Sequence, residues 1–183
     1  GLSGLTLAKI ASEAGLSAGS VNFHFDCKES LLLATLVHLA EELEHSVDRA
    51  IAHATATPEA RLLALMEASL DPLITEPRKM AVWYAFSAEA RSREDYQRIC
   101  GAQDLKIFNL THQFCNAIIR NGNKTQQMHS LAMANAIQGL VDEIWQGILF
   151  AGDSYDREQS RFLYLSFLSS VFPWAFESPE RTV

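Results

Sequence analysis

Small and polar side chains gather on the second of two short helical patterns near the start of the sequence. Thr6 and Ser17 are typical N-caps for these patterns, because a short side-chain oxygen accepts a hydrogen bond from an amide of the first turn. Gly15 lies between the patterns and favours the left-handed conformation that ends a helix. Two helices joined in this way form a helix-turn-helix, whose second helix can enter the major groove of DNA. The chemistry offered by residues 18–24 is therefore contact with base edges.

The outward side chains of this second helix are the ones that could contact DNA. Val21 and Phe25 are four residues apart and should point inward, and Leu16 should contact the core from the turn. Lys28 precedes the next helix, whose N-terminus favours phosphate groups, although a solvated surface lysine is the alternative. An αα-hairpin that never meets DNA has the same spacing, so spacing alone leaves both interpretations open. The candidate DNA-binding residues are Thr6, Ser17, Ala18, Gly19, Ser20, Asn22, Phe23, His24 and Lys28.

The segment IASEAGLSAGSVNFHFDCKESLL, residues 10–32, resembles the signature of the TetR family of one-component repressors. This resemblance implies a DNA-binding helix-turn-helix head. Such repressors usually carry a tyrosine where Asn22 stands and often a basic residue where Ala18 stands. Both positions face the groove, so the operator sequence cannot be transferred from a relative. The matching positions are Ile10, Ala11, Ala14, Gly15, Leu16, Ser17, Gly19, Phe23, His24, Phe25, Lys28 and Leu31.

The charge balance is unusual for a DNA-binding protein, because affinity for phosphates comes largely from Lys and Arg. The net charge is −7, and residues 1–30 contain only Lys9 and Lys28 as basic side chains. The resemblance places residues 1–4 in the loop that follows a first helix. We therefore expect a further N-terminal helix, often basic in this family, to cover an apolar face of the head. The acidic balance would then belong mainly to the rest of the chain.

Composition limits the other classes of function. The 183 residues are 48% apolar, without a run of about 18 apolar residues or a secretory leader pattern, so we expect a cytoplasmic protein without a membrane span. Cys27, Cys100 and Cys115 lack metal-ligand spacing and indicate reduced thiols. The six histidines are scattered, and no nucleophile elbow occurs. We expect no metal, no cofactor, no catalytic residue and no enzyme activity.

Helical periodicity runs through the remaining sequence and predicts an all-α protein with a helical-bundle body. Pro72 should kink or end the helix that contains it. The stretch MAVWYAFSAEA is apolar on nearly all sides, which predicts a helix buried all round. The expected helices are 29–54, 57–75, 78–92, 93–120, 125–151 and 156–174. The expected domains are a helix-turn-helix DNA-binding domain (1–30), a connecting helix (31–54), a ligand-binding and dimerisation domain (55–176) and a frayed tail (177–183).

The final helix carries apolar side chains on more than one face, so it needs two packing partners. One partner is the core of its own chain, and the other is a second subunit. In TetR-like proteins the last two long helices form a four-helix dimer interface, which implies a homodimer here.

The body is similar to BetI-like repressors, which control choline-to-betaine genes and respond to choline. The similar segments are KMAVWYAFSAEA, RICGAQDLKIFNLTHQFCNAI and AIQGLVDEIWQGILFAGDSYDREQ. A quaternary ammonium has no proton to donate, so aromatic faces hold it through cation–π attraction, with a carboxylate nearby. Asp142 lies one turn before Trp145 and could supply the charge, with Glu89 and Asp104 as rivals. The candidate ligand-binding residues are Trp83, Tyr84, Glu89, Asp104, Phe108, His112, Asp142 and Trp145.

Each of these assignments has an alternative. The aromatic side chains of Trp83 and Tyr84 could simply fill the core, and Asp142 could face solvent or the dimer seam. The sequence as a whole predicts a ligand-responsive DNA-binding repressor that senses choline or a related quaternary ammonium compound. The alternatives are an all-helical small-molecule-binding protein or enzyme that does not bind DNA, and a TetR-like DNA-binding protein whose solid body responds to a protein partner.

Overall fold

The computed structural model describes residues 4–90, 94–125 and 127–180. Within these ranges the chain forms eight α-helices and no strand, which confirms the all-α prediction. None of the described helices combines the length and the apolar character that a membrane span requires. The helices are α1 (Leu7–Glu13), α2 (Ala18–His24), α3 (Lys28–His53), α4 (Pro58–Ser69), α5 (Pro77–Ala90), α6 (Glu94–Asn121), α7 (Ser130–Ala151) and α8 (Arg157–Val171).

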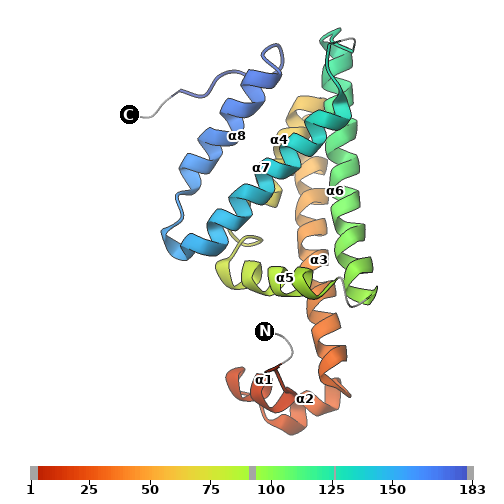
Figure 1. Cartoon of the computed structure of the whole chain (residues 1–183), viewed down its shortest axis with the longest axis vertical. Coiled ribbons are helices and arrows are strands. Elements are labelled where there is room, and N and C mark those ends of the chain that lie inside the picture. Colours follow the sequence, from red (N-terminus) through yellow and green to blue (C-terminus); the bar gives the residue numbers. More distant parts are fainter. Residues whose placement is uncertain (1–3, 91–93, 126, 181–183) are drawn as a thin grey trace.

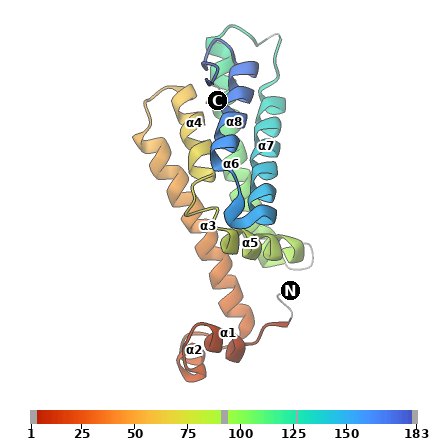
Figure 2. The same ribbon diagram turned by 90° about the vertical axis from the view of Figure 1, so that its left-hand side faces the viewer.

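The molecule is a small head joined to a larger helical body by α3 (Figure 1). Helices α1 and α2 form the head at one end, and α3 runs from it into the body beside α4 and α6 (Figures 1 and 2). Helix α5 crosses the end of the body that faces the head. Helix α7 packs across α6, and α8 lies on the outer side.

The predicted caps organise the head and the start of α4. The Thr6 side chain accepts a hydrogen bond from the Lys9 amide at 3.2 Å, and Ser17 accepts one from the Ser20 amide at 3.0 Å. Gly15 has a φ of +67°, which a residue with a side chain adopts only at a cost. These local signals depend only on neighbouring residues, which is why the sequence predicted them.

Two apolar clusters make up the core, and Trp145 packs against both. The larger cluster joins the second half of α3 to α4, α6, α7 and α8. The smaller one joins the first half of α3 to α5 and the start of α6. Trp145 therefore lies at the junction between the main body and the part of the body nearest the head.

Two helix boundaries differ from the prediction. Helix α4 ends at Ser69, before Pro72, and residues 71–75 form a turn in which the Thr75 amide donates to the Asp71 carbonyl at 2.8 Å. Helix α7 begins at Ser130 and not at residue 125, and Asn123 takes a left-handed φ of +55° in the turn that follows α6. The expected helix start at residue 93 and the loop at residues 1–3 lie outside the described residues.

Two burial predictions are wrong. Leu16 is 54% exposed and does not contact the core. Helix α5 buries only a stripe formed by Met80, Trp83 and Phe86, while Ala81 and others face solvent. The physical reason is position: α5 lies across one end of the body and has neighbours on one side only (Figure 1).

Candidate functional site

The outward face of α2 is fully presented at the free end of the head (Figure 1). Val21 is buried, as predicted, and the other α2 side chains are exposed. Phe23 is 86% exposed, and its ring meets the ring of His24 edge-on with centroids 5.2 Å apart. An aromatic side chain this exposed offers an apolar surface for contact with another molecule. The predicted DNA-binding residues on α2, together with the caps Thr6 and Ser17, therefore share one end of the molecule.

Lys28 lies inside α3 as its first residue, and does not precede the helix as predicted. Cys27 is the N-cap, and Ser30 Oγ donates a hydrogen bond to the Cys27 carbonyl at 2.7 Å. The Lys28 Nζ lies 3.8 Å from Glu29 Oε1, and its side chain is 20% exposed. The ammonium group thus sits at the N-terminal turn of α3, where an anion is favoured.

A cavity of about 420 Å³ lies in the body, and residues of α3, α4, α5, α6 and α7 line it. Five of the eight predicted ligand-binding residues line it, from three different helices: Trp83 of α5, Asp104 and Phe108 of α6, and Asp142 and Trp145 of α7. The body therefore has space for a small molecule beside these residues. The remaining lining residues are Leu43, Ser69, Leu105, Ile107, Gln138 and Val141.

The aromatic wall of the cavity is held in place by packing and by one hydrogen bond. Trp145 Nε1 donates to the backbone carbonyl of Ser69 at 2.9 Å, which fixes the orientation of the indole ring. Trp83 is 9% exposed and packs in the smaller apolar cluster. With Phe108, these two rings give the cavity three aromatic side chains, the surfaces that attract an organic cation.

The cavity carries negative charge without a built-in counter-ion. Burial raises the pKa of Asp142, and burial together with the charge of Asp142 raises the pKa of Asp104. Of the described residues that line the cavity none is basic, and no described Lys, Arg or His forms an ion pair with either carboxylate. Asp104 and Asp142 are nevertheless exposed side chains, so they lie where the cavity opens to solvent. Unpaired carboxylates at the opening attract a cationic ligand that enters there.

Two family models match the chain, one over the head and the start of α3 and the other over most of the body. Residues 1–35 match the model for bacterial regulatory proteins of the tetR family, and residues 58–173 match the model for the C-terminal part of BetI-type transcriptional repressors. The chain is a TetR-family regulator of the BetI type. Regulators of this family bind DNA operators and effector ligands and act as dimers.

Individual relatives agree with this assignment. The chain is 30% identical over 162 residues to the HTH-type transcriptional regulator BetI of Stenotrophomonas maltophilia, covering 88% of this chain and 79% of that protein. It is 29% identical over 159 residues to the BetI of Paraburkholderia xenovorans, covering 86% and 78%. A crystal structure from Pseudomonas aeruginosa PAO1 shares the fold, with a TM-score of 0.79 at 21% identity over 94% of this chain and 83% of that one. The resemblance seen in the sequence is confirmed.

Three predicted ligand residues of this BetI-type chain do not line the cavity. His112 Nε2 lies 3.0 Å from Ser130 Oγ, and its ring stacks on Phe108 with centroids 6.3 Å apart, so it supports the wall from behind. Tyr84 is half-buried, and its pKa is raised by burial and by the charge of Asp142. Glu89 lies farther along α5, outside the lining.

Sequence reasoning missed some of the lining, notably Ser69 and Gln138. Gln138 lies one turn before Asp142 on the same helix, and that spacing could have identified it. Ser69 holds Trp145 through its backbone carbonyl, for which the sequence carries no signal. Among the described residues no group of three or more metal-binding side chains occurs.

Proposed function

We propose that this regulator is a homodimeric repressor that releases operator DNA when choline or a related quaternary ammonium ion occupies the cavity. The choice of a quaternary ammonium as ligand rests on one observation. The cavity combines three aromatic rings with two carboxylates that have no basic partner among the described residues. A cation over an aromatic face gains about 0.5–2 kcal/mol per favourable contact, more when water is excluded. A quaternary ammonium also carries no N–H group that would need a hydrogen-bond acceptor in the cavity.

We infer that the two chains associate through α7 and α8. Leu131 and Phe150 on α7 are 55% and 84% exposed, and Leu163 on α8 is 47% exposed. Large exposed apolar side chains along these two helices favour a protein interface. A homodimer would bring two heads to DNA half-sites one helical turn, or a multiple of it, apart.

The proposed division of labour follows the expected domains. Residues 1–30 would read DNA, residues 31–54 would connect, and residues 55–176 would bind the effector and dimerise. Choline can release DNA only if it binds the DNA-free arrangement of the heads more tightly than the DNA-bound one. The cavity must therefore change shape when the heads move.

A titration with four compounds tests the proposal. The intact protein is titrated calorimetrically with choline, with betaine, with a hydrophobic primary amine and with the uncharged carbon analogue of choline, in which a tert-butyl group replaces trimethylammonium. We expect saturable binding of choline and at least tenfold weaker binding of the carbon analogue, a difference of about 1.4 kcal/mol. Equal affinity for choline and its carbon analogue would show that the positive charge does not contribute to binding, and would overturn the ligand assignment.

A mobility shift with DNA from upstream of the gene tests the repressor part separately. The protein should retard this DNA, and choline should reverse the shift at concentrations that saturate the calorimetric titration. Retardation that choline does not reverse would leave a DNA-binding protein without this effector. No retardation at low salt would contradict DNA binding itself.

A further inference from the structure

The turn between α4 and α5, residues 70–76, receives a charged side chain from α8. Arg157 Nη1 donates to the Leu70 carbonyl at 3.2 Å and to Thr75 Oγ1 at 2.7 Å, and its Nη2 donates to the Thr75 carbonyl at 3.1 Å. A planar guanidinium with three hydrogen bonds to one turn holds that turn in a defined geometry. The turn is therefore attached to the outer helix of the body.

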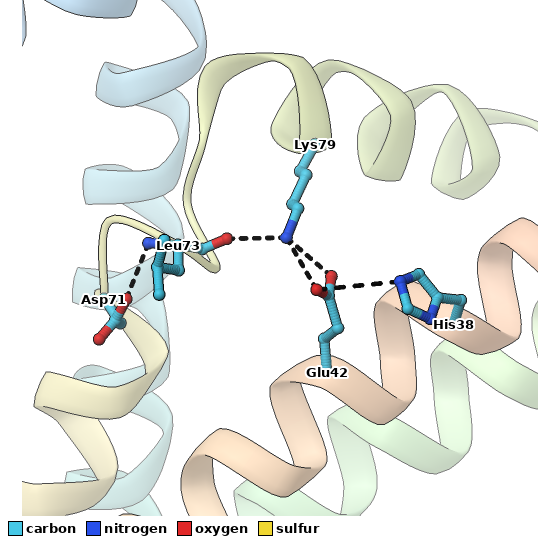
Figure 3. A network of polar contacts seen from close by, with 5 residues as sticks. All are labelled: His38, Glu42, Asp71, Leu73 and Lys79. Carbon is cyan, nitrogen blue, oxygen red and sulfur yellow. Dashed lines mark hydrogen bonds and ion pairs between the residues drawn. The ribbon is translucent and has the colours of Figure 1, made fainter. Parts of the chain in front are cut away.

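On the opposite side, Lys79 attaches the same turn to α3. Its Nζ donates to the Leu73 carbonyl at 2.9 Å and to both carboxylate oxygens of Glu42, at 2.8 and 3.0 Å (Figure 3). His38 Nε2 lies 3.8 Å from Glu42 Oε1, one turn earlier on α3 (Figure 3). A single ammonium group thus joins the turn, α5 and the helix that carries the head.

The turn and the ion pair both adjoin the effector cavity. Ser69, which lines the cavity and accepts the Trp145 hydrogen bond, immediately precedes the turn. Leu43, which also lines the cavity, immediately follows Glu42. Trp83 and Trp145 line the cavity on one side and, on the other, a space of about 20 Å³ that Glu42 and Lys79 border. The two indoles are therefore the shared wall between the cavity and the ion pair.

We propose that Lys79 is the positioning residue through which occupation of the cavity changes the direction of α3 and hence the placement of the head. The inference rests on the proposed function, because it takes the cavity as the effector site. A ligand that displaces Trp83 or Trp145 moves the wall against which Glu42 and Lys79 lie. The Arg157 contacts hold the turn, so the displacement is taken up where Lys79 meets α3.

Because α3 is long, a small tilt at the contact with Lys79 moves the head by a larger distance. Glu42 lies roughly 20 Å from the first residue of α3, since a helix rises about 1.5 Å per residue. A tilt of about 5° at Glu42 would move the start of the helix by roughly 2 Å. A displacement of roughly 2 Å is more than half of the ~3.4 Å rise of one base pair along DNA.

We expect the stability of the protein to depend little on the ion pair between Lys79 and Glu42. An effect of Lys79→Met on the head can then be distinguished from a loss of folding. The side chains of Lys79 and Glu42 are 27% and 32% exposed, and ion pairs at such accessible sites contribute little to folding. A matched control pairs with the same helix, α3, from another element. Lys106 of α6 lies 2.5 Å from Glu44 and 3.1 Å from Asp48, with 34% of its side chain exposed. Lys106→Met also removes a contact to α3, but it does not touch the turn.

The test measures the position of the head directly. Spin labels are placed on Cys27, which is exposed, and on a cysteine introduced by Gln113→Cys on α6, because Cys100 and Cys115 are buried. Labelled chains are diluted with unlabelled full-length protein so that only distances within one chain contribute. Distance distributions are recorded for otherwise wild-type protein, Lys79→Met, Glu42→Gln, the combined Lys79→Met and Glu42→Gln variant and Lys106→Met, each with and without choline.

We expect Lys79→Met and Glu42→Gln to broaden the distance distribution without choline, the combined variant to add nothing further, and Lys106→Met to leave it unchanged. We also expect choline to shift the wild-type distribution and to raise the operator Kd by about tenfold, whereas Lys79→Met should reduce that factor to about twofold. Choline affinity itself should change by less than about twofold.

Two outcomes would overturn the inference. One is an unchanged distance distribution in Lys79→Met, and the other is equal broadening in Lys106→Met. The failure of the proposed function looks different: choline would neither bind nor shift the wild-type distribution. The broadening caused by Lys79→Met without choline would still decide the role of Lys79 in that case.

Discussion

Asp104 on α6 and Asp142 on α7 face one cavity, and the charge of Asp142 adds to burial in raising the pKa of Asp104. Each carboxylate makes the ionised form of the other less favourable, and among the described residues no basic side chain relieves either of them. Sites that keep unfavourable charge in the absence of a ligand gain binding energy when the ligand supplies the counter-charge.

Removing one of these charges should separate ligand binding from stability. Asp142→Asn should weaken choline binding by about tenfold to a hundredfold, roughly 1.4–2.8 kcal/mol, because the cation loses a partner at short range. The same change should raise the melting temperature of the ligand-free protein by about 1–2 °C, because an unfavourable charge is gone. Calorimetric titration and thermal denaturation measure the two effects.

Asp153→Asn is the matched control, because Asp153 is exposed in the 3₁₀ turn after α7 and does not line the cavity. It should change neither choline affinity nor melting temperature. If Asp142→Asn bound choline as tightly as the wild type, Asp142 would have no part in the effector site.

Protein stability and choline affinity should change in opposite directions as the pH rises. The pKa values of Asp104 and Asp142 are raised from their ordinary value of 3.8, so the folded protein holds these protons more tightly than the unfolded chain does. Their contribution to stability is complete below pH 3.8 and is lost as the pH rises through the raised values. Choline affinity should instead rise over that range, because only the ionised carboxylates attract the cation. Titrations across this range of pH, with Asp104→Asn as the comparison, measure both trends; an affinity independent of pH would contradict ionic recognition.

The local features of the fold were predictable from the sequence, whereas its long-range packing was not. The caps Thr6 and Ser17 and the glycine turn at Gly15 depend on a few adjacent residues, and each was predicted. The burial of α5 was not, because an apolar helix is buried all round only if neighbours surround it, and its place at the end of the body decides that. Pro72 was predicted to kink or end its helix, and α4 indeed ends before it, at Ser69 and not at residue 75.

The site shows the same division. Asp142 and Trp145 share one helix face, so their spacing alone brought them together. Tyr84 was predicted as an aromatic face and Glu89 as a possible carboxylate, but Trp83 is the one described residue of α5 that lines the cavity. Which side of α5 meets the cavity depends on its contacts with α3, α6 and α7, and these have no signature in a single segment.

Trp145→Phe should affect both stability and ligand binding. Phenylalanine keeps an aromatic face but cannot donate to the buried Ser69 carbonyl, which costs about 1–3 kcal/mol for an acceptor left unsatisfied. The control is Trp174→Phe, since Trp174 Nε1 donates to the Ile118 carbonyl at 3.3 Å, away from the cavity. Both variants should melt at lower temperature, by about 2–4 °C for each kcal/mol lost. Only Trp145→Phe should weaken choline binding in calorimetry; equal choline affinity in the two variants would remove Trp145 from the aromatic wall.

Lys28→Ala should weaken DNA binding uniformly across sequences. The ammonium group lies at the N-terminal turn of α3, where a phosphate would also meet the helix dipole. The slope of log affinity against log salt should fall by about 1 for each head. Lys124→Ala, in the body beside Trp174, is the control and should leave the slope unchanged. An unaltered affinity and slope in Lys28→Ala would show that Lys28 is a structural lysine paired with Glu29.

Asn22→Ala should change which bases are preferred and leave the salt dependence as it is. Asn22 is exposed on the outward face of α2 beside Phe23, where an amide can pair with a base edge but carries no charge to displace a counter-ion. Losing such a pairing removes about 1–3 kcal/mol of discrimination at one position of each half-site. Selection of binding sites from a random DNA pool, carried out with wild type, Asn22→Ala and Lys28→Ala in parallel, measures the base profile. A profile that Asn22→Ala leaves unaltered would assign base recognition to the other exposed α2 residues. A profile that Lys28→Ala alters would contradict the division between phosphate contact at α3 and base contact at α2.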